Sequence, residues 1–371
     1  MIDNARVQSE DKRRVVDAAV QRPTKATSPT TPRRATVRAI AQLADVSPAS
    51  VSRALNDPAK VSRHTLSRIH AAMDRLNDDR PVASPAALKT IGYLSVDRTS
   101  GPRFSGYNTT IFAGLARVAI ENGTEVLLVN PDRRRPGQSL GELCRERGIG
   151  GLIIRLDDQS MPVIDEVAAS GLPAIVVAQP HDVAGVGWVC VDSHRASLDA
   201  VQYLISMGHR RIAFCKNIVP DHDHAERHRG YTEALELAGI ERRPEYELTV
   251  PADVFGGITA INRLLALPEP PTAVYVADPG ATMGVLRRLR ETGVRVPDDF
   301  SVVGFDDEDT RFASSPVYTS VWQDAADLAR VAGQAIVRLM AVGASAEVPR
   351  VRLPSYLEVN ATTAPPSASK P

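Results

Sequence analysis

The sequence of 371 residues is poor in cysteine and in aromatic side chains, and it contains no long apolar run. Its three cysteines, Cys144, Cys190 and Cys215, are too few and too scattered for a disulfide framework or a cysteine-rich zinc site, which fits a reducing compartment. No stretch approaches the roughly 18 apolar residues of a membrane helix, and the charged first residues lack the apolar region of a secretory signal. We therefore expect a cytoplasmic protein that has no membrane partner.

The net charge of zero conceals an uneven distribution of charged residues. Residues 1–90 contain 16 basic and 9 acidic side chains, whereas the remaining residues contain 28 basic and 35 acidic ones. A basic head on an acidic body favours contact between the head and a polyanion, although a basic tail alone would give the same balance. Hydrophobic residues make up 43% and aromatic residues only 5%, so the chain can bury a core that is mostly aliphatic.

Changes in composition divide the chain into segments. Residues 1–34 are rich in Pro, Thr and Ser without apolar periodicity, and we expect a disordered basic arm there. Residues 35–79 carry three short helical patterns, and residues 80–90 form a hinge or linker. Strand-like and helix-like stretches alternate over 91–366, and 367–371 is a short disordered tail.

The helical patterns over 35–79 predict a helix-turn-helix domain that is wholly α-helical. Val37, Ile40 and Ala41 share one face of a first helix. Ser47 can cap a second helix, with Pro48 at its first position, where a missing N–H costs little. A three-residue turn between two short helices is typical of this motif, and a third helix is expected to start at residue 62.

The second helix is the expected recognition helix. In such domains this helix enters the major groove with its N-terminal residues against base edges. Arg53 can form two hydrogen bonds to a guanine, whereas Ala49 can offer only apolar contact, for instance to a thymine methyl group. The expected DNA contacts are Thr36, Ser47, Pro48, Ala49, Ser50, Ser52, Arg53, Asn56, Lys60 and Thr65. The alternative is a small helical bundle that binds no nucleic acid, which the cap, the turn and the basic head disfavour.

The alternation over 91–366 predicts an α/β effector domain with parallel sheets that helices cover on both faces. About ten apolar strand patterns exceed one small doubly wound unit, so two lobes are expected. We place the first lobe at about 91–190 plus 321–346, and the second at about 191–320 plus 347–363.

The segment TVRAIAQLADVSPASVSRALNDPAKVSRHTLSRI resembles the DNA-binding headpiece of the LacI/GalR family of bacterial transcription regulators. Its most specific part is S-x-x-S-V-S-R-A-L-N, and blocks such as LISMGHRRIAF, RHRGYTEAL and VPDDFSVVGFDD follow in the order of the family. The resemblance implies a headpiece, a hinge and a two-lobed effector domain of the periplasmic-binding-protein type. It also implies a homodimer on palindromic operator DNA, associated with the nucleoid, with a small-molecule effector that is commonly a sugar. We expect no cofactor.

Some positions depart from the pattern of this family. Asp45 stands in the turn where the family usually has Gly; because Asp tolerates positive φ better than most residues, we expect the turn to survive. In the hinge, Leu88 occupies the position of the apolar wedge that the family inserts into the minor groove. Val82 replaces the usual Asn, and Pro85 falls inside the expected hinge helix, which puts formation of that helix in doubt.

The resemblance also implies an effector pocket between the lobes. Arg227 matches the ligand-binding arginine of the family, Asp306 matches its aspartate, and Asp278 stands where the family usually has Asn. The expected effector-binding residues are Phe104, Tyr107, Asn108, Arg227, Asp278 and Asp306. The alternatives are a surface ion pair for Arg227, a capping or turn carboxylate for Asp306 and a core position for the aromatic residues. Two carboxylates favour a neutral polyhydroxylated ligand or a cationic one over a sugar phosphate.

Other functions find less support in the sequence. DHDHAERH at 221–228 resembles a metal site in composition, but we interpret it as a solvated polar loop and expect no metal. No pairing of nucleophile and base is evident, so an enzyme is not expected. The expected function is that of a sequence-specific transcriptional repressor. A neutral mono- or oligosaccharide is expected to control its affinity for the operator. The alternative is a stand-alone ligand-binding protein of the periplasmic sugar-binding type.

Overall fold

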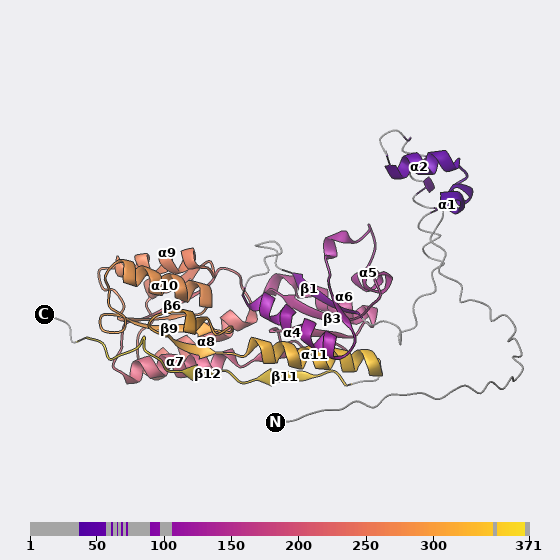
Figure 1. Ribbon diagram of the computed structural model, residues 1–371. Coiled ribbons are helices and arrows are strands. Elements are labelled where there is room, and N and C mark those ends of the chain that lie inside the picture. The colour runs from indigo at the N-terminus through magenta and orange to yellow at the C-terminus, as the bar shows by residue number, and fades with distance from the viewer. Residues whose placement is uncertain are drawn as a thin grey trace, which may run out of the picture. The chain divides into compact units, whose positions relative to one another are not determined.

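The computed structural model describes residues 37–56, 61, 65, 68–69, 72, 90–96, 106–343 and 347–367. The chain divides into two compact units, Met1–Pro81 and Val82–Pro371, which are considered separately (Figure 1). Several expected features lie outside the described residues: the arm at 1–34, Thr36, Lys60, the hinge residues Val82, Pro85 and Leu88, and Phe104.

The first unit contains helices α1 (Val37–Leu43) and α2 (Pro48–Asn56). The backbone N–H of Ser50 donates to Ser47 Oγ at 3.1 Å, so Ser47 caps α2 as expected. The helices pack through a small apolar cluster that consists of Ile40, Ala41, Ala44, Val51, Ala54, Ile69 and Ala72. Val37, which the periodicity assigned to the shared apolar face of the first helix, is exposed, and so is Leu55 of α2.

Asp45 lies in the turn between α1 and α2 and has a φ of 49°, as its replacement of glycine predicted. Arg68 holds this turn, because its Nη2 donates to the Asp45 carbonyl oxygen at 2.9 Å and to Oδ2 at 3.0 Å. The Asp45 side chain therefore combines tolerance of the left-handed region with an ion pair to the third helical segment.

We expect Asp45→Ala to destabilise the headpiece by about 1 kcal/mol, because alanine tolerates positive φ poorly and lacks the carboxylate. Amide hydrogen exchange of α1 and α2 in the full chain should then become several-fold faster. Asp45→Asn, which keeps the tolerance of positive φ, serves as the control and should lose only the ion pair. Equal exchange in Asp45→Ala and the unmodified chain would contradict the interpretation.

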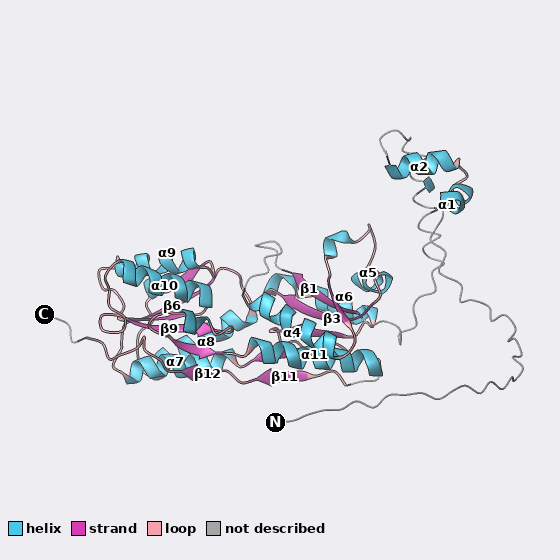
Figure 2. Cartoon of the chain, in the orientation of Figure 1, coloured by secondary structure: helices cyan, strands magenta, loops and turns pink. Residues whose placement is uncertain are grey.

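Figure 2 shows the strands of the second unit in magenta and its helices in cyan. The first lobe of this unit is built on a parallel sheet in the order β11-β5-β4-β3-β1-β2. Its strands are β1 (Thr90–Val96), β2 (Glu125–Leu128), β3 (Ile149–Leu156), β4 (Ala174–Val177), β5 (Gly187–Val191) and β11 (Arg350–Leu353). Its helices are α4 (Tyr107–Glu121), α5 (Leu140–Glu146), α6 (Pro162–Ser170) and α11 (Ala325–Val342), with short 3-10 turns at Pro131–Arg133 and Asp158–Ser160.

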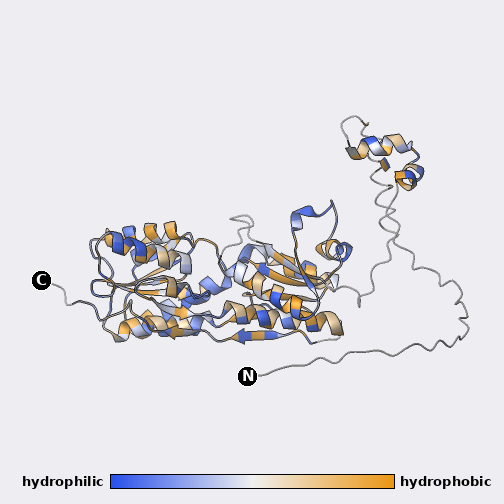
Figure 3. Ribbon diagram, in the orientation of Figure 1, coloured by the Kyte–Doolittle hydropathy of each residue, from blue (hydrophilic) through white to orange (hydrophobic). Residues whose placement is uncertain are grey.

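Strand residues of this sheet alternate between two cores. Ile153 faces α4 and α11, whereas its neighbours Leu152 and Ile154 face α5 and α6. Because both faces are covered, the central strands are continuous apolar runs, as Figure 3 shows.

The second lobe has the sheet order β12-β10-β9-β8-β6-β7, in which only β12 is antiparallel to its neighbour. Its strands are β6 (Ile212–Asn217), β7 (Glu247–Val250), β8 (Ala273–Val276), β9 (Ser301–Asp306), β10 (Thr319–Trp322) and β12 (Tyr356–Glu358). Helices α7 (Ser193–Ser206) and α8 (His222–Leu237) cover one face, and α9 (Val254–Leu265) and α10 (Pro279–Glu291) cover the other. Short 3-10 turns lie at Pro244–Tyr246 and Thr310–Ala313.

The α/β architecture with two lobes is confirmed. The last part of the chain differs from the expected lobe boundaries. Residues 347–363 were placed in the second lobe, but β11 pairs with β5 in the first sheet, and only β12 belongs to the second. β10, which starts at Thr319, pairs with β9 and so lies wholly in the second lobe. No helix in the described part of the chain is long and apolar enough to cross a membrane.

Helices α9 and α10 approach each other closely through glycine. A Cβ atom on Gly257 would lie 2.0 Å from the carbonyl oxygen of Ala281, and one on Gly284 would lie 2.1 Å from that of Val254. We expect Gly257→Ala to destabilise the second lobe by about 2 kcal/mol, because the helix backbones must separate.

Urea unfolding followed by Trp322 fluorescence in a Trp188→Phe background measures this effect. Gly333→Ala in α11 of the first lobe, followed by Trp188 fluorescence in a Trp322→Phe background, is the matched control, since the three atoms nearest to its Cβ would be side-chain atoms of Val118, the closest at 3.1 Å. Equal stability of the two variants would show that the close approach of α9 and α10 does not determine the free energy of unfolding of the second lobe.

Candidate DNA-binding and effector sites

The outer face of α2 carries the residues that the sequence predicted to contact DNA. Ser47, Pro48, Ala49, Ser52 and Arg53 are exposed, whereas Val51 and Ala54 between them are buried. Ser50 is half-buried, and its Oγ lies 2.9 Å from Ser47 Oγ.

The helix therefore presents its N-terminal turn and Arg53 to solvent, as base readout requires. Asn56 ends α2, and Thr65 lies in a helical segment and is half-buried. Contact of these residues with DNA stays a prediction.

In the second unit, polar residues from both lobes meet at the carboxyl ends of the two sheets. Thr110 Oγ1 at the start of α4 donates to Glu308 Oε1 at 2.5 Å. The N–H of Asp158 donates to the carbonyl oxygen of Pro220 at 3.2 Å. Arg155 Nη2 in β3 donates to Asp221 Oδ2 at 2.9 Å. The carboxyl ends of parallel strands are where open α/β sheets bind ligands, so this junction is the candidate effector site.

A chain of ionic hydrogen bonds runs through the junction. Asp221 caps α8, and its Oδ1 lies 2.7 Å from His224 Nδ1. His224 Nε2 lies 3.0 Å from Asp278 Oδ1. Burial alone would lower the pKa of His224, but the two carboxylates outweigh it and raise the pKa to about 10. His224 is therefore a buried cation at neutral pH and connects α8 with the end of β8.

This arrangement corrects the interpretation of 221–228 as a solvated loop. Residues 222–228 form the first turns of α8, and Asp223, His224 and Arg227 are buried. Its histidines have separate partners, because His224 contacts Asp221 and Asp278 whereas His228 Nε2 lies 2.6 Å from Glu247 Oε2. Among the described residues no group of three histidine, cysteine or carboxylate side chains could hold a metal ion.

Arg227 projects from α8 into the junction and is only 4% exposed, so it is not part of a surface ion pair. Its Nη1 donates to the carbonyl oxygen of Ala277 at 2.7 Å, and its guanidinium carbon lies 3.5 Å from the ring centroid of Phe305. Its Nη2 is 3.9 Å from Asp223 Oδ2, and its buried Nε has no hydrogen-bond partner. Arg227 thus retains a donor for a ligand.

Asp306 is fully buried, and its own loop uses both of its carboxylate oxygens. Oδ1 accepts from the N–H and hydroxyl of Thr310 at 3.0 and 2.7 Å, and Oδ2 accepts from Arg311 Nη1 at 2.7 Å. The alternative of a turn carboxylate therefore describes Asp306 better than direct ligand contact. The next residue, Asp307, is buried and makes no side-chain hydrogen bond to any described residue.

Tyr107 and Asn108 begin α4 at the edge of the junction. The Tyr107 hydroxyl is buried and has no hydrogen-bond partner among the described residues, and the guanidinium carbon of Arg155 lies 5.7 Å from its ring centroid. Burial raises the pKa of Tyr107 well above its usual value, and the charge of Asp223 adds to the rise. Asn108 Oδ1 accepts a long hydrogen bond from the Tyr93 hydroxyl at 3.4 Å.

Sequence reasoning missed several residues of the junction, among them Arg155, Asp223, Asp307 and Gln323. Arg155 was detectable as a charge at the end of an apolar strand, and Asp307 as the second carboxylate of GFDD. Gln323 follows β10, is 1% exposed and has no partner for either side-chain amide atom. A single glutamine after a strand gives no signal in the sequence.

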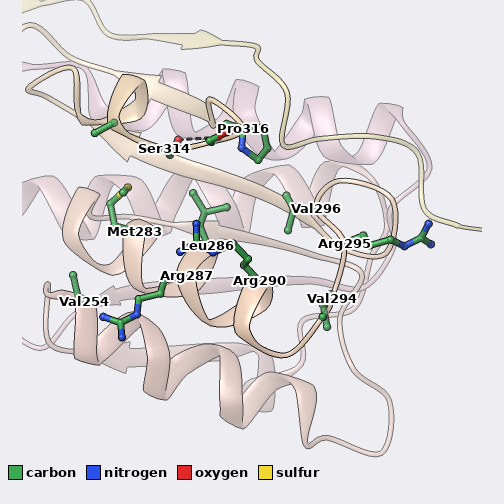
Figure 4. A pocket seen from close by; sticks show the side chains of 13 residues that line it. Val254, Met283, Leu286, Arg287, Arg290, Val294, Arg295, Val296, Ser314 and Pro316 are labelled. Atoms are coloured by element: carbon green, nitrogen blue, oxygen red, sulfur yellow. Dashed lines mark hydrogen bonds between the residues drawn. The ribbon is translucent and has the colours of Figure 1, made fainter.

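A groove of about 640 Å³ lies elsewhere in the second lobe, beside α10 (Figure 4). Met283 and Leu286 contribute apolar surface, and Arg287 and Arg295 lie at its rim. Both arginines are paired, with Glu291 at 2.8 Å and with Asp299 respectively. The groove contains none of the predicted effector residues, so the junction remains the candidate site.

Comparisons with known proteins agree with this architecture. Residues 36–77 match the family described as "Bacterial regulatory proteins, lacI family", and residues 201–363 match a "Periplasmic binding protein-like domain". The chain is 31% identical over 276 residues to the probable HTH-type transcriptional repressor ExuR of Bacillus subtilis (strain 168). That match covers 73% of this chain and 81% of the relative.

Two solved structures with bound sugars are similar over most of the chain. The transcriptional regulator CelR in complex with cellobiose has a TM-score of 0.65 at 26% identity and covers 89% of this chain and 100% of its own. A LacI family transcriptional regulator from Enterococcus faecium with bound ribose has a TM-score of 0.65 at 27% identity and covers 75% of this chain and 99% of its own.

The headpiece and the two-lobed domain together define a DNA-binding transcriptional regulator. The chain belongs to the lacI family of bacterial regulatory proteins. The resemblance seen in the sequence is thereby confirmed, and the regulator is favoured over a stand-alone binding protein of the periplasmic type.

Proposed function

We propose that the protein is a repressor, and that a sugar bound at the junction between the lobes controls its affinity for operator DNA. One observation carries this proposal: buried side chains from both lobes retain unpaired polar atoms at the junction. They are the Tyr107 hydroxyl, Asp223 Oδ1, Arg227 Nε and the Gln323 amide. Buried polar groups normally have partners, so these atoms fit the hydroxyl groups of a ligand. The sugar-bound structures similar to this chain support the same ligand class.

The proposed mechanism follows from differential binding. A ligand that contacts Tyr107 on the first lobe and Arg227 on the second binds one arrangement of the lobes more tightly than others. Within this proposal Asp278 acts through His224, and Asp306 positions the loop that carries Asp307. Asn108 borders the site, and a ligand contact by Phe104 stays a prediction from the sequence.

We further propose a homodimer that reads a near-palindromic operator with two copies of α2. The proposed DNA contacts are the ten residues that the sequence predicts: Thr36, Ser47, Pro48, Ala49, Ser50, Ser52, Arg53, Asn56, Lys60 and Thr65. The supporting observation is the exposure of Arg53 and the N-terminal turn of α2. No enzymatic activity is part of the proposal.

Selection from a random duplex library with the full chain tests DNA recognition, and we expect a near-palindrome of two half-sites. A sugar panel added to the selected complex then tests the effector, with thermal shift as the second readout. A ligand should raise thermal stability and change operator affinity together. Selection of no sequence would overturn the operator assignment, and stabilisation without any effect on DNA would overturn the coupling.

A further inference from the structure

The junction holds more buried negative charge than positive charge. The carboxylates are Asp221, Asp223, Asp278 and Asp307, and the cations are Arg155, His224 and Arg227. Asp306 and Arg311 pair with each other at 2.7 Å, so they add no net charge. Among the described residues, the carboxyl groups of the junction therefore outnumber its cations, and the partly buried Glu308 adds to this excess.

The hydrogen bonds show which carboxylates lack a partner. Arg155 and His224 bind Asp221, and His224 also binds Asp278. Arg227 directs its Nη1 to a backbone carbonyl oxygen and stays 3.9 Å from Asp223. Among the described residues Asp223 Oδ1 has no hydrogen-bond partner, while Oδ2 lies at the outer limit of an ion pair with Arg227.

Asp307 makes no side-chain hydrogen bond to any described residue, although it is only 7% exposed. Burial raises the pKa of Asp307 to about 7, and Arg227 only partly opposes this rise. Burial also raises the pKa of Asp223. An isolated buried carboxylate is unfavourable, and a positive charge nearby would stabilise it. The junction thus supplies one cation, Arg227, to two buried carboxyl groups, Asp223 and Asp307.

We propose that the effector is a polyhydroxylated ligand that carries a protonated amine, such as an amino sugar, with its ammonium group against Asp307 and Asp223. The hydroxyl groups then bind Arg227 Nε, the Tyr107 hydroxyl and the Gln323 amide, whose atoms are unpaired. An ammonium group supplies three donors and one positive charge, which are the properties that the two carboxylates require. This inference rests on the proposed function, because it specifies the ligand class of the same site.

Matched sugars test the charge of the ligand. Glucosamine, galactosamine and mannosamine are each compared with the parent sugar and its N-acetyl derivative, using calorimetry and thermal shift on the full chain at pH 7. We expect at least one amine to bind ten-fold or more tightly than both of its neutral counterparts. Equal or tighter binding of a neutral sugar would overturn this inference but leave the proposed function intact. Binding of none of these sugars would overturn this inference, while the broader panel with the operator decides the proposed function.

Substitution of single carboxylates distinguishes a ligand contact from a structural role. We expect Asp307→Asn to weaken binding of the amine at least ten-fold and to leave its neutral counterpart unaffected, because the amide keeps the shape without the charge. Asp223→Asn should act in the same direction. Asp309→Asn is the matched control, since Asp309 lies on the same loop but is exposed and pairs with Arg311 at 2.9 Å. An equal loss for charged and neutral sugars in both variants would overturn the inference.

Discussion

Replacement of Arg227 by alanine is expected to abolish the response of operator binding to the effector. The unliganded protein should keep its affinity for DNA within a few-fold. The reason is that Arg227 is buried at the junction, where its Nε has no hydrogen-bond acceptor among the described residues, whereas α2 belongs to a separate compact unit. Loss of a charged hydrogen bond and of the adjoining contacts should weaken the effector about 100-fold, or about 3 kcal/mol. Operator titrations with and without the effector measure both quantities.

Two further variants separate ligand binding from stability. Arg229→Ala removes an exposed arginine of α8 that pairs with Glu226 at 2.7 Å, and it should leave the response unchanged. Arg227→Lys keeps the charge but loses the planar fork over Phe305, so it should restore only part of the affinity. An unchanged response in Arg227→Ala would remove this residue from the site. A large fall in melting temperature for both Arg227 variants would assign it a structural role.

The sequence predicted the sheets well because burial on both faces leaves a strong signal. β3 and β4 are continuous apolar runs between two helical layers, and such runs are recognised without knowledge of their partners. β11 was missed because alternate residues are exposed at the edge of the sheet, where Arg350 and Arg352 interrupt the pattern. Its pairing with β5, more than 150 residues earlier, is a long-range choice that local patterns do not determine.

The site was predictable where single residues match a family motif, as Arg227 does. The roles of the two carboxylates in GFDD were not predictable, because they depend on the loop that follows. Thr310 and Arg311 fold back onto Asp306 and make no side-chain hydrogen bond to Asp307, and nothing in the spacing distinguishes the two carboxylates. The polar stretch at 221–228 also failed as a signal, since charged residues are buried there only through pairing across elements.

Arg53→Ala is expected to produce the largest loss of operator affinity. Arg53 is exposed on α2 one turn beyond its N-terminus, where a guanidinium can bond to a guanine through two hydrogen bonds. Each such contact is worth about 1–3 kcal/mol, and a dimer that reads two half-sites makes it twice, so the total loss is about 2–6 kcal/mol. Titration of the selected operator with the unliganded protein measures the loss.

Specificity decides whether this contact is to a base or to a phosphate. With Arg53→Ala, the unmodified operator and an operator changed at one guanine per half-site should bind with similar affinity, because the side chain that distinguishes them is absent. Arg38→Ala on the exposed face of α1 provides the control. If Arg38 contributes at all, it should weaken all sequences alike and reduce the salt dependence of binding. A uniform loss in Arg53→Ala would reassign this residue to the phosphate backbone, and base recognition by α2 would then depend on Pro48, Ala49 and Ser50.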